Sequence, residues 1–549
     1  MTILTMNRKE LEKKVGRITK EIEAKITQFG TPVEEINEGE VSIEIFPNRP
    51  DLLSLQNFAR ALNQYNEKGG VSKFKILPPE KDFVVTIDKS VKQVRPYTCC
   101  AIVKGMKFDD EKIKEIIDIQ EKLHGSIGRK RKKLAIGIYP LEKIKLPIRF
   151  MAKKPEEIKF IPLEYPKELN GKQILRQHPT GREYADLLKD ADVFPIFIDA
   201  NDQILSMPPI INSENTGRIT DKTTDIFIEC SGFNLHYLKK CINIIVSALY
   251  EMGGKVYAMN IKDSKEKDFV SPDMTSEEMK FNIVDVEKTL GIKLTEKEVK
   301  KFLERMGIGY ENRNGQIVAV IPAYRTDILH WVDLAEEVAI AYGYENFDAE
   351  IPKISTIAEE DKMAKIKRTI SQILSGLGLL ETSSFHLTTK KNIKKMDYEF
   401  KDFIEILDSK TERDCLRADL MTNLLQILSE NSNAQYPQKI FEMGKVFSID
   451  ATEKSETKVI EKENLAIALI DEKMNFTEIK QVLDYFFKML NLEYKIEGVE
   501  NPGYISGRVG KIIVDGKDIG FVGEIAPRVL KNWKIKMPVV AVEIGIGEL

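Results

Sequence analysis

The sequence is poor in several features that define whole classes of protein. Among 549 residues there are five cysteines, none in C-x-x-C spacing, which argues against a disulfide scaffold and a structural zinc site. Five scattered histidines argue against a histidine-rich metal centre. No run approaches the roughly 18 apolar residues of a membrane span, and MTILTMNRKELEKK lacks the apolar region of a signal peptide. We therefore expect a cytoplasmic protein with no membrane segment.

Neither sign of charge dominates the chain. Lys and Arg number 83 against 86 Asp and Glu, a formal net charge of −3, so any nucleic-acid contact must come from a local patch. The chain does have length and apolar material, with 42% hydrophobic residues. At roughly 100–200 residues per domain, its length predicts three to five domains, each with a core of its own.

The pattern of apolar residues predicts an α+β protein. One charged helix is expected over residues 7–29, and Val41, Ile43 and Ile45 alternate as in a strand. After Pro50, apolar residues recur at helical spacing, and Pro50 itself suits a first helical turn. The last 200 residues alternate helix and strand signals, and the turn sequence at 514–516 favours antiparallel neighbours over a parallel doubly wound sheet.

Two proline-bearing junctions, at 271–272 and 351–352, bracket a segment that predicts a small domain. The sequence shows no repeat of 20–50 residues and no low-complexity tract.

Four carboxylates gather in PAYRTDILHWVDLAEEVAIAYGY. Asp333, Glu336 and Glu337 have the spacing of one helix face, and Asp327 lies just before that helix. All-oxygen donors without cysteine or histidine suit magnesium better than zinc. The competing interpretation is that acids at a helix start only complement its dipole.

A basic loop is the second candidate. Between residues 126 and 161 there are 11 Lys and Arg against three Glu, and five cations follow one another at 129–133. Five adjacent cations suit a phosphate backbone, which needs charge and no base readout. A solvated loop without a partner explains the same run.

The stretch MPPIINSENTGRITDKTTDIFIEC is the third candidate. Asn212, Ser213, Thr220 and Glu229 are its main candidate site residues. In TTDIFIEC the strand alternation places Glu229 opposite the isoleucines, where it can orient water or bind an amine. An ordinary turn is the competing interpretation.

His178, in QHPTGREYADLL, has two interpretations. The imidazole, the charges and the phenol of this segment suit a substrate-facing loop. A helix entry with Thr180 as cap and Glu183 three residues later explains the same residues.

Four separated motifs carry a resemblance that covers essentially the whole chain. They are FPNRPDLLSLQNFARAL, IPAYRTDILHWVDLAEEVAIAYGYENF, CLRADLMTNLLQIL followed by KIFEMGKVF, and GRVGKIIVDGKDIGFVGEIAPRVLKNWKIKMPVVAVEI. In this order they resemble the β subunit of phenylalanyl-tRNA synthetase. The length, without room for two modules of bacterial relatives, is similar to the archaeal and eukaryotic cytosolic type.

The resemblance implies four units: an N-terminal domain with the NRPDL motif (1–90), a tRNA editing module (91–267), a small winged-helix-like magnesium-binding domain (268–348) and a class II synthetase-like core without catalytic function (349–549). The editing module would hydrolyse tyrosine wrongly attached to phenylalanine tRNA. The family's Mg ligands fall on Asp327, Asp333, Glu336 and Glu337. Glu229, Asn212, Ser213 and Thr220 are our candidates for the editing site.

The class II core would be inactive because residues of that chemistry are missing. KIFEMGKVF keeps Glu442 but has Lys439 and Ile440 where the phosphate-binding arginine belongs, and no arginine follows the final glycines. ATP and phenylalanine would therefore be bound by a partner α subunit, in an assembly of two α and two β chains.

Two alternatives remain at this point. One is a purely structural and tRNA-binding subunit without editing activity. The other is a free-standing nucleic-acid-binding protein, against which the net charge and the acidic helix face argue.

Overall fold

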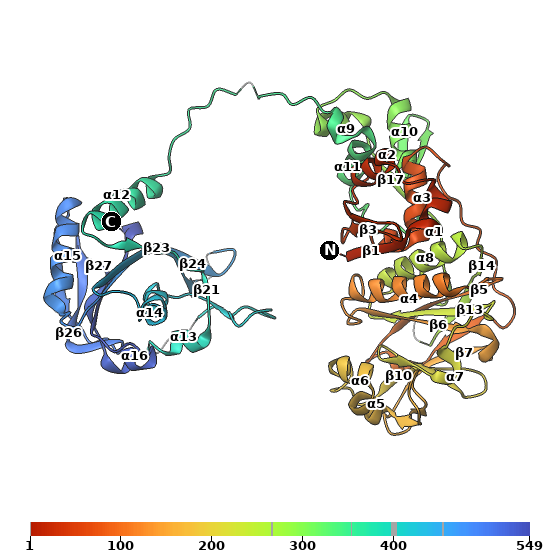
Figure 1. Ribbon diagram of the computed structural model, residues 1–549, viewed down its shortest axis with the longest axis horizontal. Coiled ribbons are helices and arrows are strands. Elements are labelled where there is room, and N and C mark those ends of the chain that lie inside the picture. The colour runs from red at the N-terminus through yellow and green to blue at the C-terminus, as the bar shows by residue number, and fades with distance from the viewer. Residues whose placement is uncertain (1, 265–266, 353, 397–402, 453–454, 549) are drawn as a thin grey trace. The chain divides into compact units, whose positions relative to one another are not determined.

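The chain forms two compact units, Met1–Ile351 and Pro352–Leu549. The computed structural model in Figure 1 describes residues 2–264, 267–352, 354–396, 403–452 and 455–548. The first unit ends at the residue before the proline of the second junction. In the described ranges, no helix is both long and apolar enough to cross a membrane.

The first unit begins with three helices and a three-stranded sheet. The elements are β1 (Thr2–Asn7), α1 (Arg8–Val15), α2 (Lys20–Gln28), β2 (Val33–Ile36), β3 (Glu40–Ile45) and α3 (Leu55–Tyr65), with sheet order β1-β3-β2. The single helix expected over 7–29 is wrong. Asn7 caps α1, and Gly16, at φ +91°, ends it in a conformation that favours glycine. The predicted strand at 41–45 is confirmed, with its three apolar side chains buried.

The same element order returns near the end of this unit. It comprises β17 (Glu277–Lys280), α9 (Ile283–Leu290), α10 (Glu296–Arg305), β18 (Gly309–Arg313), β19 (Gln316–Ile321) and α11 (Trp331–Tyr342), with sheet order β17-β19-β18. We call residues 2–65 and 277–342 the first and second fold repeats. A positive-φ glycine ends the first helix of each repeat, and a threonine caps the second. Each copy is longer than the repeats of 20–50 residues that the sequence excludes.

Between the repeats lie two sheets that pack face to face. The first has the order β14-β5-β13-β6, with β14 (Lys255–Tyr257), β5 (Tyr97–Lys104), β13 (Ile226–Gly232) and β6 (Leu134–Pro140). The second has the order β12-β11-β10-β7-β4-β15-β16, with β12 (Ile211–Asn212), β11 (Ile204–Met207), β10 (Phe194–Ile198), β7 (Ile148–Lys153), β4 (Val84–Ile87), β15 (Met259–Asp263) and β16 (Phe269–Ser271). We call these two sheets, with the segments that connect their strands, the two-sheet module. Because β4 and β16 belong to its second sheet, this module extends slightly beyond the expected bounds of 91–267 at both ends.

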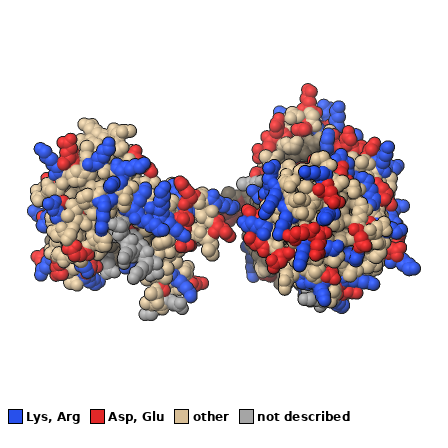
Figure 2. Space-filling model, turned by 90° about the horizontal axis from the view of Figure 1, so that it is seen from below, with Lys and Arg blue, Asp and Glu red and all other residues tan. Residues whose placement is uncertain are grey.

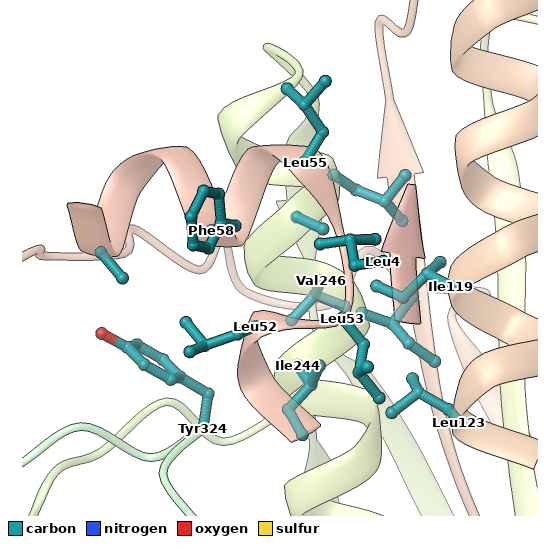
Figure 3. Close-up of a cluster of buried hydrophobic side chains, with 14 of the residues drawn as sticks. Leu4, Leu52, Leu53, Leu55, Phe58, Ile119, Leu123, Ile244, Val246 and Tyr324 are labelled. Carbon is teal, nitrogen blue, oxygen red and sulfur yellow. The ribbon is translucent and has the colours of Figure 1, made fainter. Parts of the chain in front are cut away.

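The outer face of the four-stranded sheet is covered by α4 (Asp110–Gly125) and α8 (Leu235–Glu251). Figure 3 shows how this helical layer joins the first fold repeat: Leu53 lies beside Ile244, and Leu52 and Phe58 belong to the same buried cluster as Ile244 and Val246. The repeat and the two-sheet module therefore share one hydrophobic core.

The second unit is an antiparallel sheet with helices on both faces. Its strand order is β20-β23-β24-β28-β27-β26-β25, and only β20 pairs in parallel. The strands are β20 (Leu380–Glu381), β23 (Gln438–Ile449), β24 (Val459–Ile470), β25 (Tyr494–Gly498), β26 (Tyr504–Val514), β27 (Lys517–Ile525) and β28 (Val539–Gly545). The sheet packs against α12 (Lys362–Gly376), α14 (Met421–Glu430), α15 (Phe476–Met489) and α16 (Pro527–Asn532). The predicted multidomain α+β class is confirmed, as is the turn at 514–516.

Candidate functional site

Glu229 lies on the central strand β13 and is 2% exposed. As predicted, the strand alternates: Ile226 and Ile228 pack toward α4 and α8, while Phe227 belongs to the cluster between the two sheets. Glu229 shares the side of Phe227, so a carboxyl group points into the layer between the two sheets, beside the apolar cluster that contains Phe227.

Glu229 and two other polar side chains, each from a different strand, meet at the hydroxyl of Tyr139. The hydroxyl of Tyr139 on β6 lies 2.8 Å from Ser206 Oγ, 3.3 Å from Asn212 Oδ1 and 3.4 Å from Glu229 Oε1. Glu229 Oε2 is buried, and no described donor lies within 3.5 Å of it in hydrogen-bonding geometry. Ser231, two residues further along the same strand, has a nearby hydroxyl that lowers the pKa of this carboxyl. A buried acceptor without a donor is costly, so Oε2 is poised to accept a hydrogen bond from a ligand.

Gly137 makes room for this arrangement. It pairs with Glu229 across the strands, and a Cβ built there would lie 2.2 Å from the Tyr139 hydroxyl and 2.6 Å from Glu229 Oε1. A glycine inside a strand often marks such a close approach.

These groups open into a cavity of about 490 Å³, which we call the Glu229 cavity. Asn212, Ser206, His178 and Thr180 lie in its wall, together with apolar side chains of α4 and β6. In the described structure neither Ser213 nor Thr220 lines it. Ser213 is buried, with its backbone N–H donating to Leu205, and the Thr220 hydroxyl accepts from the Lys222 N–H. Of the four candidates, the structure brings Glu229 and Asn212 together.

Burial raises the pKa of Glu229 to about 8, while the charge of the buried Arg95 pulls it the other way without cancelling the effect. Burial also raises the pKa of Tyr139 well above its usual value, followed by the nearby Glu229. At neutral pH both groups are therefore mainly protonated. Because it is mainly protonated, the carboxyl group of Glu229 can form hydrogen bonds but is a poor general base.

His178 belongs to this cavity. It precedes the short helix α6 (Pro179–Glu183), and its Nε2 lies 3.2 Å from the Leu163 carbonyl oxygen. The expected Thr180 cap is wrong, because His178 occupies the N-cap position and no side chain caps this helix in the described structure. Thr180 lies inside the helix and lines the cavity with His178.

The four acids around α11 line a second cavity of about 430 Å³. Arg325 donates to both oxygens of Asp327 at 2.9 and 2.7 Å and lies 2.9 Å from Glu337. Asp333 accepts the N–H groups of Leu329 and His330, as the third helical residue of a capping box does, with His330 at the N-cap position. The structure therefore keeps both sequence interpretations open: the acids share a cavity, and one of them takes part in capping the helix.

Whether these acids fit magnesium depends on their donors and their surroundings. Burial raises the pKa of Glu336, and Glu337, Asp333 and Asp327 raise it further, so a cation here would relieve repulsion. Glu337 Oε2 is buried without a partner among the described residues. The all-oxygen donor chemistry thus fits a hard cation. As the side chains stand, the described residues contain no group of three converging ligands.

In the second unit, Glu442 on β23 forms a buried ion pair with Arg417 at 2.6 Å, both side chains being 2% exposed. Arg417 also donates to the Lys445 carbonyl at 2.8 Å, and a Cβ at Gly444 would lie 2.2 Å from its Nη2. The sequence gives no sign of this pairing, because Arg417 lies on a different segment from Glu442. The charge of Glu442 is therefore balanced by an arginine of the same unit.

Three family models match the chain in order. They are the B3/4 domain over residues 82–244, the tRNA synthetase B5 domain over 279–344 and the phenylalanyl tRNA synthetase beta chain CLM domain over 348–546. The Glu229 cavity lies mainly in the first match and the acids of α11 in the second.

Whole-chain relatives agree with these matches. The phenylalanine–tRNA ligase beta subunit of Pyrococcus abyssi is 39% identical over 91% of this chain and 90% of its own length. That of Methanosarcina acetivorans is 34% identical over 100% of this chain and 99% of its own. A crystal structure of an N-terminal fragment of the phenylalanyl-tRNA synthetase β-subunit from Pyrococcus horikoshii matches with a TM-score of 0.59 and 34% identity, covering 62% of this chain and 99% of that one. The chain therefore belongs to the phenylalanine–tRNA ligase beta subunit family of aminoacyl-tRNA synthetases.

Proposed function

We propose that this chain is the editing and scaffolding β subunit of a cytoplasmic phenylalanine–tRNA ligase, and that it hydrolyses tyrosine wrongly attached to phenylalanine tRNA. The α subunit would bind ATP and phenylalanine and charge the tRNA, in an assembly of two α and two β chains. The observation that carries the editing role is the buried, unpartnered Oε2 of Glu229 in a cavity large enough for an amino-acid side chain.

Tyrosine differs from phenylalanine by one hydroxyl group. A pocket that only excludes larger side chains rejects such a near-isostere weakly, whereas a buried acceptor favours the ligand that can donate to it. Phenylalanine would leave that acceptor unpaired. Glu229 Oε2 offers such a hydrogen-bonding group, as an acceptor when the carboxyl is ionised and as a donor when it carries the proton. The Tyr139 hydroxyl, which also lies within hydrogen-bonding distance of Ser206 and Asn212, lies next to Glu229 Oε1 and helps to hold the carboxyl in place.

In this proposal Glu229 recognises the substrate hydroxyl rather than activating water, since its raised pKa keeps it mainly protonated at neutral pH. Hydrolysis then joins the oxygen of water to the ester carbonyl carbon, and the ribose oxygen leaves with a proton. Asn212, His178 and Thr180 lie in the cavity wall, where they can orient the ester. Ser213 anchors the segment next to Asn212 through its N–H, which donates to the Leu205 carbonyl. Thr220 belongs to the following turn, where it hydrogen-bonds with Lys222 and Thr223.

The test uses the complex reconstituted with its α subunit. Glu229→Gln is measured for hydrolysis of Tyr-tRNA and, separately, for charging with phenylalanine. Loss of hydrolysis with retained charging supports the proposal. Unchanged hydrolysis moves the site elsewhere in the two-sheet module, and a wild-type complex that hydrolyses no Tyr-tRNA leaves a purely structural and tRNA-binding subunit.

We also propose that Asp327, Asp333, Glu336 and Glu337 hold Mg²⁺. A comparison of the fold repeats supports this. Each repeat contains an Arg-x-Asp (R-x-D) motif, at residues 49–51 and 325–327. Counted from the aspartate of this motif, the first repeat has Asn57, Arg60 and Ala61 at the positions of Asp333, Glu336 and Glu337. The first repeat folds without those acids, so this fold does not require them. When bound, magnesium would neutralise the acidic cavity and stiffen it.

A further inference from the structure

We propose that the two sides of the loop of residues 129–133 have different functions. Arg131 faces inward and fixes the wall of the Glu229 cavity, while Arg129, Lys130 and Lys132 face outward and receive phosphates of the tRNA acceptor end. The loop thereby couples RNA docking to the shape of the amino-acid cavity. This inference rests on the editing role proposed above and adds to it a positioning residue and a docking surface.

The inward face is built by the contacts of Arg131, whose side chain is 13% exposed. Its Nη1 donates to the carbonyl oxygens of Ile210 at 2.9 Å and Pro209 at 3.3 Å, next to β12. Its Nη2 lies 2.9 Å from Glu121 on α4, and its guanidinium group lies 4.5 Å from the centre of the Tyr184 ring. One planar guanidinium thus joins three segments of the cavity rim, a task suited to its fixed fork of donors.

A further hydrogen-bonded chain continues from Glu121 into the sheet. Glu121 Oε1 lies 3.2 Å from His124 Nδ1, and His124 Nε2 accepts the Ile136 N–H at 2.8 Å. Glu121, His124, Arg131 and Ile136 all line the Glu229 cavity. The position of Arg131 is therefore tied to β6, the strand that carries Gly137 and Tyr139.

The backbone of the loop supports this division of faces. Arg129, Lys130 and Arg131 follow one another at φ +46°, +55° and +62°, a left-handed run that non-glycine residues seldom adopt. Such a run persists only where its surroundings fix it. Here the Arg131 N–H donates to the His124 carbonyl and the Lys133 N–H to the Gly128 carbonyl, which anchors the loop to the end of α4.

The outward face carries three cations. Arg129, Lys130 and Lys132 are exposed, and within the described structure none of them forms an ion pair. Figure 2 shows basic and acidic side chains interspersed over the visible face, in keeping with the net charge of −3. Attraction to RNA must therefore come from local groups such as these, next to the cavity that would receive the aminoacyl end.

The test compares two tyrosyl esters on the reconstituted complex: Tyr-tRNA and 2′(3′)-O-tyrosyl-adenosine, which lacks the rest of the RNA. Arg131→Gln should lower kcat about tenfold or more on both esters, because the cavity wall has shifted. Arg131→Lys should resemble it, since lysine keeps the charge but loses the fork. The triple variant Arg129→Ala, Lys130→Ala, Lys132→Ala should raise KM for Tyr-tRNA. It should also flatten the slope of log KM against log salt by about 0.7–0.9 for each phosphate that the loop no longer binds.

Lys293→Ala is the matched control, because this lysine is 93% exposed and belongs to the second fold repeat. Glu121→Gln, which weakens the same clamp from its other side, serves if Arg131 variants fail to fold. The inference is overturned if Arg131→Gln hydrolyses the small ester like wild type, or if it reproduces the KM and salt pattern of the triple variant. A wild-type complex that cleaves neither ester overturns the editing proposal itself, which is a different result.

Discussion

Arg49, in the first fold repeat, reaches Asp327 in the second, with 4.0 Å between Nε and Oδ2. Each residue also belongs to a clasp within its own repeat: Arg49 donates to both oxygens of Asp51 at 3.0 and 2.9 Å, as Arg325 does to Asp327. The two R-x-D motifs thus lie next to each other, and their buried arginines and aspartates alternate in charge. Burial would raise the pKa of Asp327, but Arg325 and Arg49 outweigh it and lower the pKa to about 2.

The first prediction concerns this network. Arg325→Met should lower the free energy of unfolding by about 3–5 kcal/mol, because it leaves Asp327 and Glu337 buried without their cation. The control is Arg313→Ala, an exposed arginine of the same repeat paired with Glu278, for which about 1 kcal/mol or less is expected. Urea unfolding followed by tryptophan fluorescence measures both, with Trp533→Phe introduced in every protein so that Trp331 alone reports. Equal losses would show that the buried network adds no stability.

The sequence predicted features governed by local pattern. Strand alternation placed Glu229 correctly, and turn chemistry placed the reversal at 514–516, because both depend on neighbouring residues. It missed the partners of Glu229 and Glu442. Tyr139 and Arg417 reach them from segments distant in the chain, and only sheet register brings them there.

The fold repeat was missed for a different reason. Its two copies share helix caps, end glycines and the R-x-D clasp, while most other positions have diverged. Gly16 gave the clearest local signal, since it breaks the helix expected over 7–29 as Gly291 ends α9. These few shared positions are enough to specify the same backbone fold, but they are too few to make the two repeats recognisably similar in sequence.

The second prediction is a pH dependence. The pKa of Glu229 is about 8 in the folded chain and near 4.5 when unfolded, so between these values the folded state holds the extra proton. Its contribution to stability is complete below pH 4.5 and is lost as pH rises toward 8, by at most about 1.4 kcal/mol per pH unit. Glu229→Gln should remove this slope. The stability of the variant relative to that of wild type should therefore increase from pH 5 to pH 8. Thermal unfolding of both proteins over that range is the measurement, and parallel curves would contradict it.

The third prediction concerns magnesium and Glu336. Without Mg²⁺, Glu336→Gln should be slightly more stable than wild type at neutral pH, since the raised pKa shows that its charge is unfavourable. With Mg²⁺, wild type should gain in Tm by ligand linkage while the variant gains less. Adding Asp333→Asn should abolish the remaining gain. A Tm indifferent to Mg²⁺ and to chelator in every protein would favour the helix-capping interpretation.

The fourth prediction concerns the second unit. Because Glu442 is neutralised by Arg417 and no arginine precedes it on β23, the chain alone should show no phenylalanine-dependent exchange of pyrophosphate into ATP. Adding the α subunit should produce exchange and a particle of two α and two β chains, measured by light scattering. Robust exchange by the isolated chain would overturn the assignment of synthesis to the partner.

The last prediction concerns Gly137. A methyl group there would lie 2.2 Å from the Tyr139 hydroxyl and 2.6 Å from Glu229 Oε1, so Gly137→Ala must push these two groups apart. We expect a loss of about 1–3 kcal/mol in stability from overpacking and a larger loss in hydrolysis of Tyr-tRNA than in phenylalanine charging. Gly125→Ala is the control: it ends α4 with no atom within 4 Å of the added Cβ, and it should be neutral or stabilising by about 0.5–1 kcal/mol. If Gly137→Ala edits like wild type, the close contact of Tyr139 and Glu229 is not needed for recognising the substrate hydroxyl, and the acceptor must be sought elsewhere in the cavity wall.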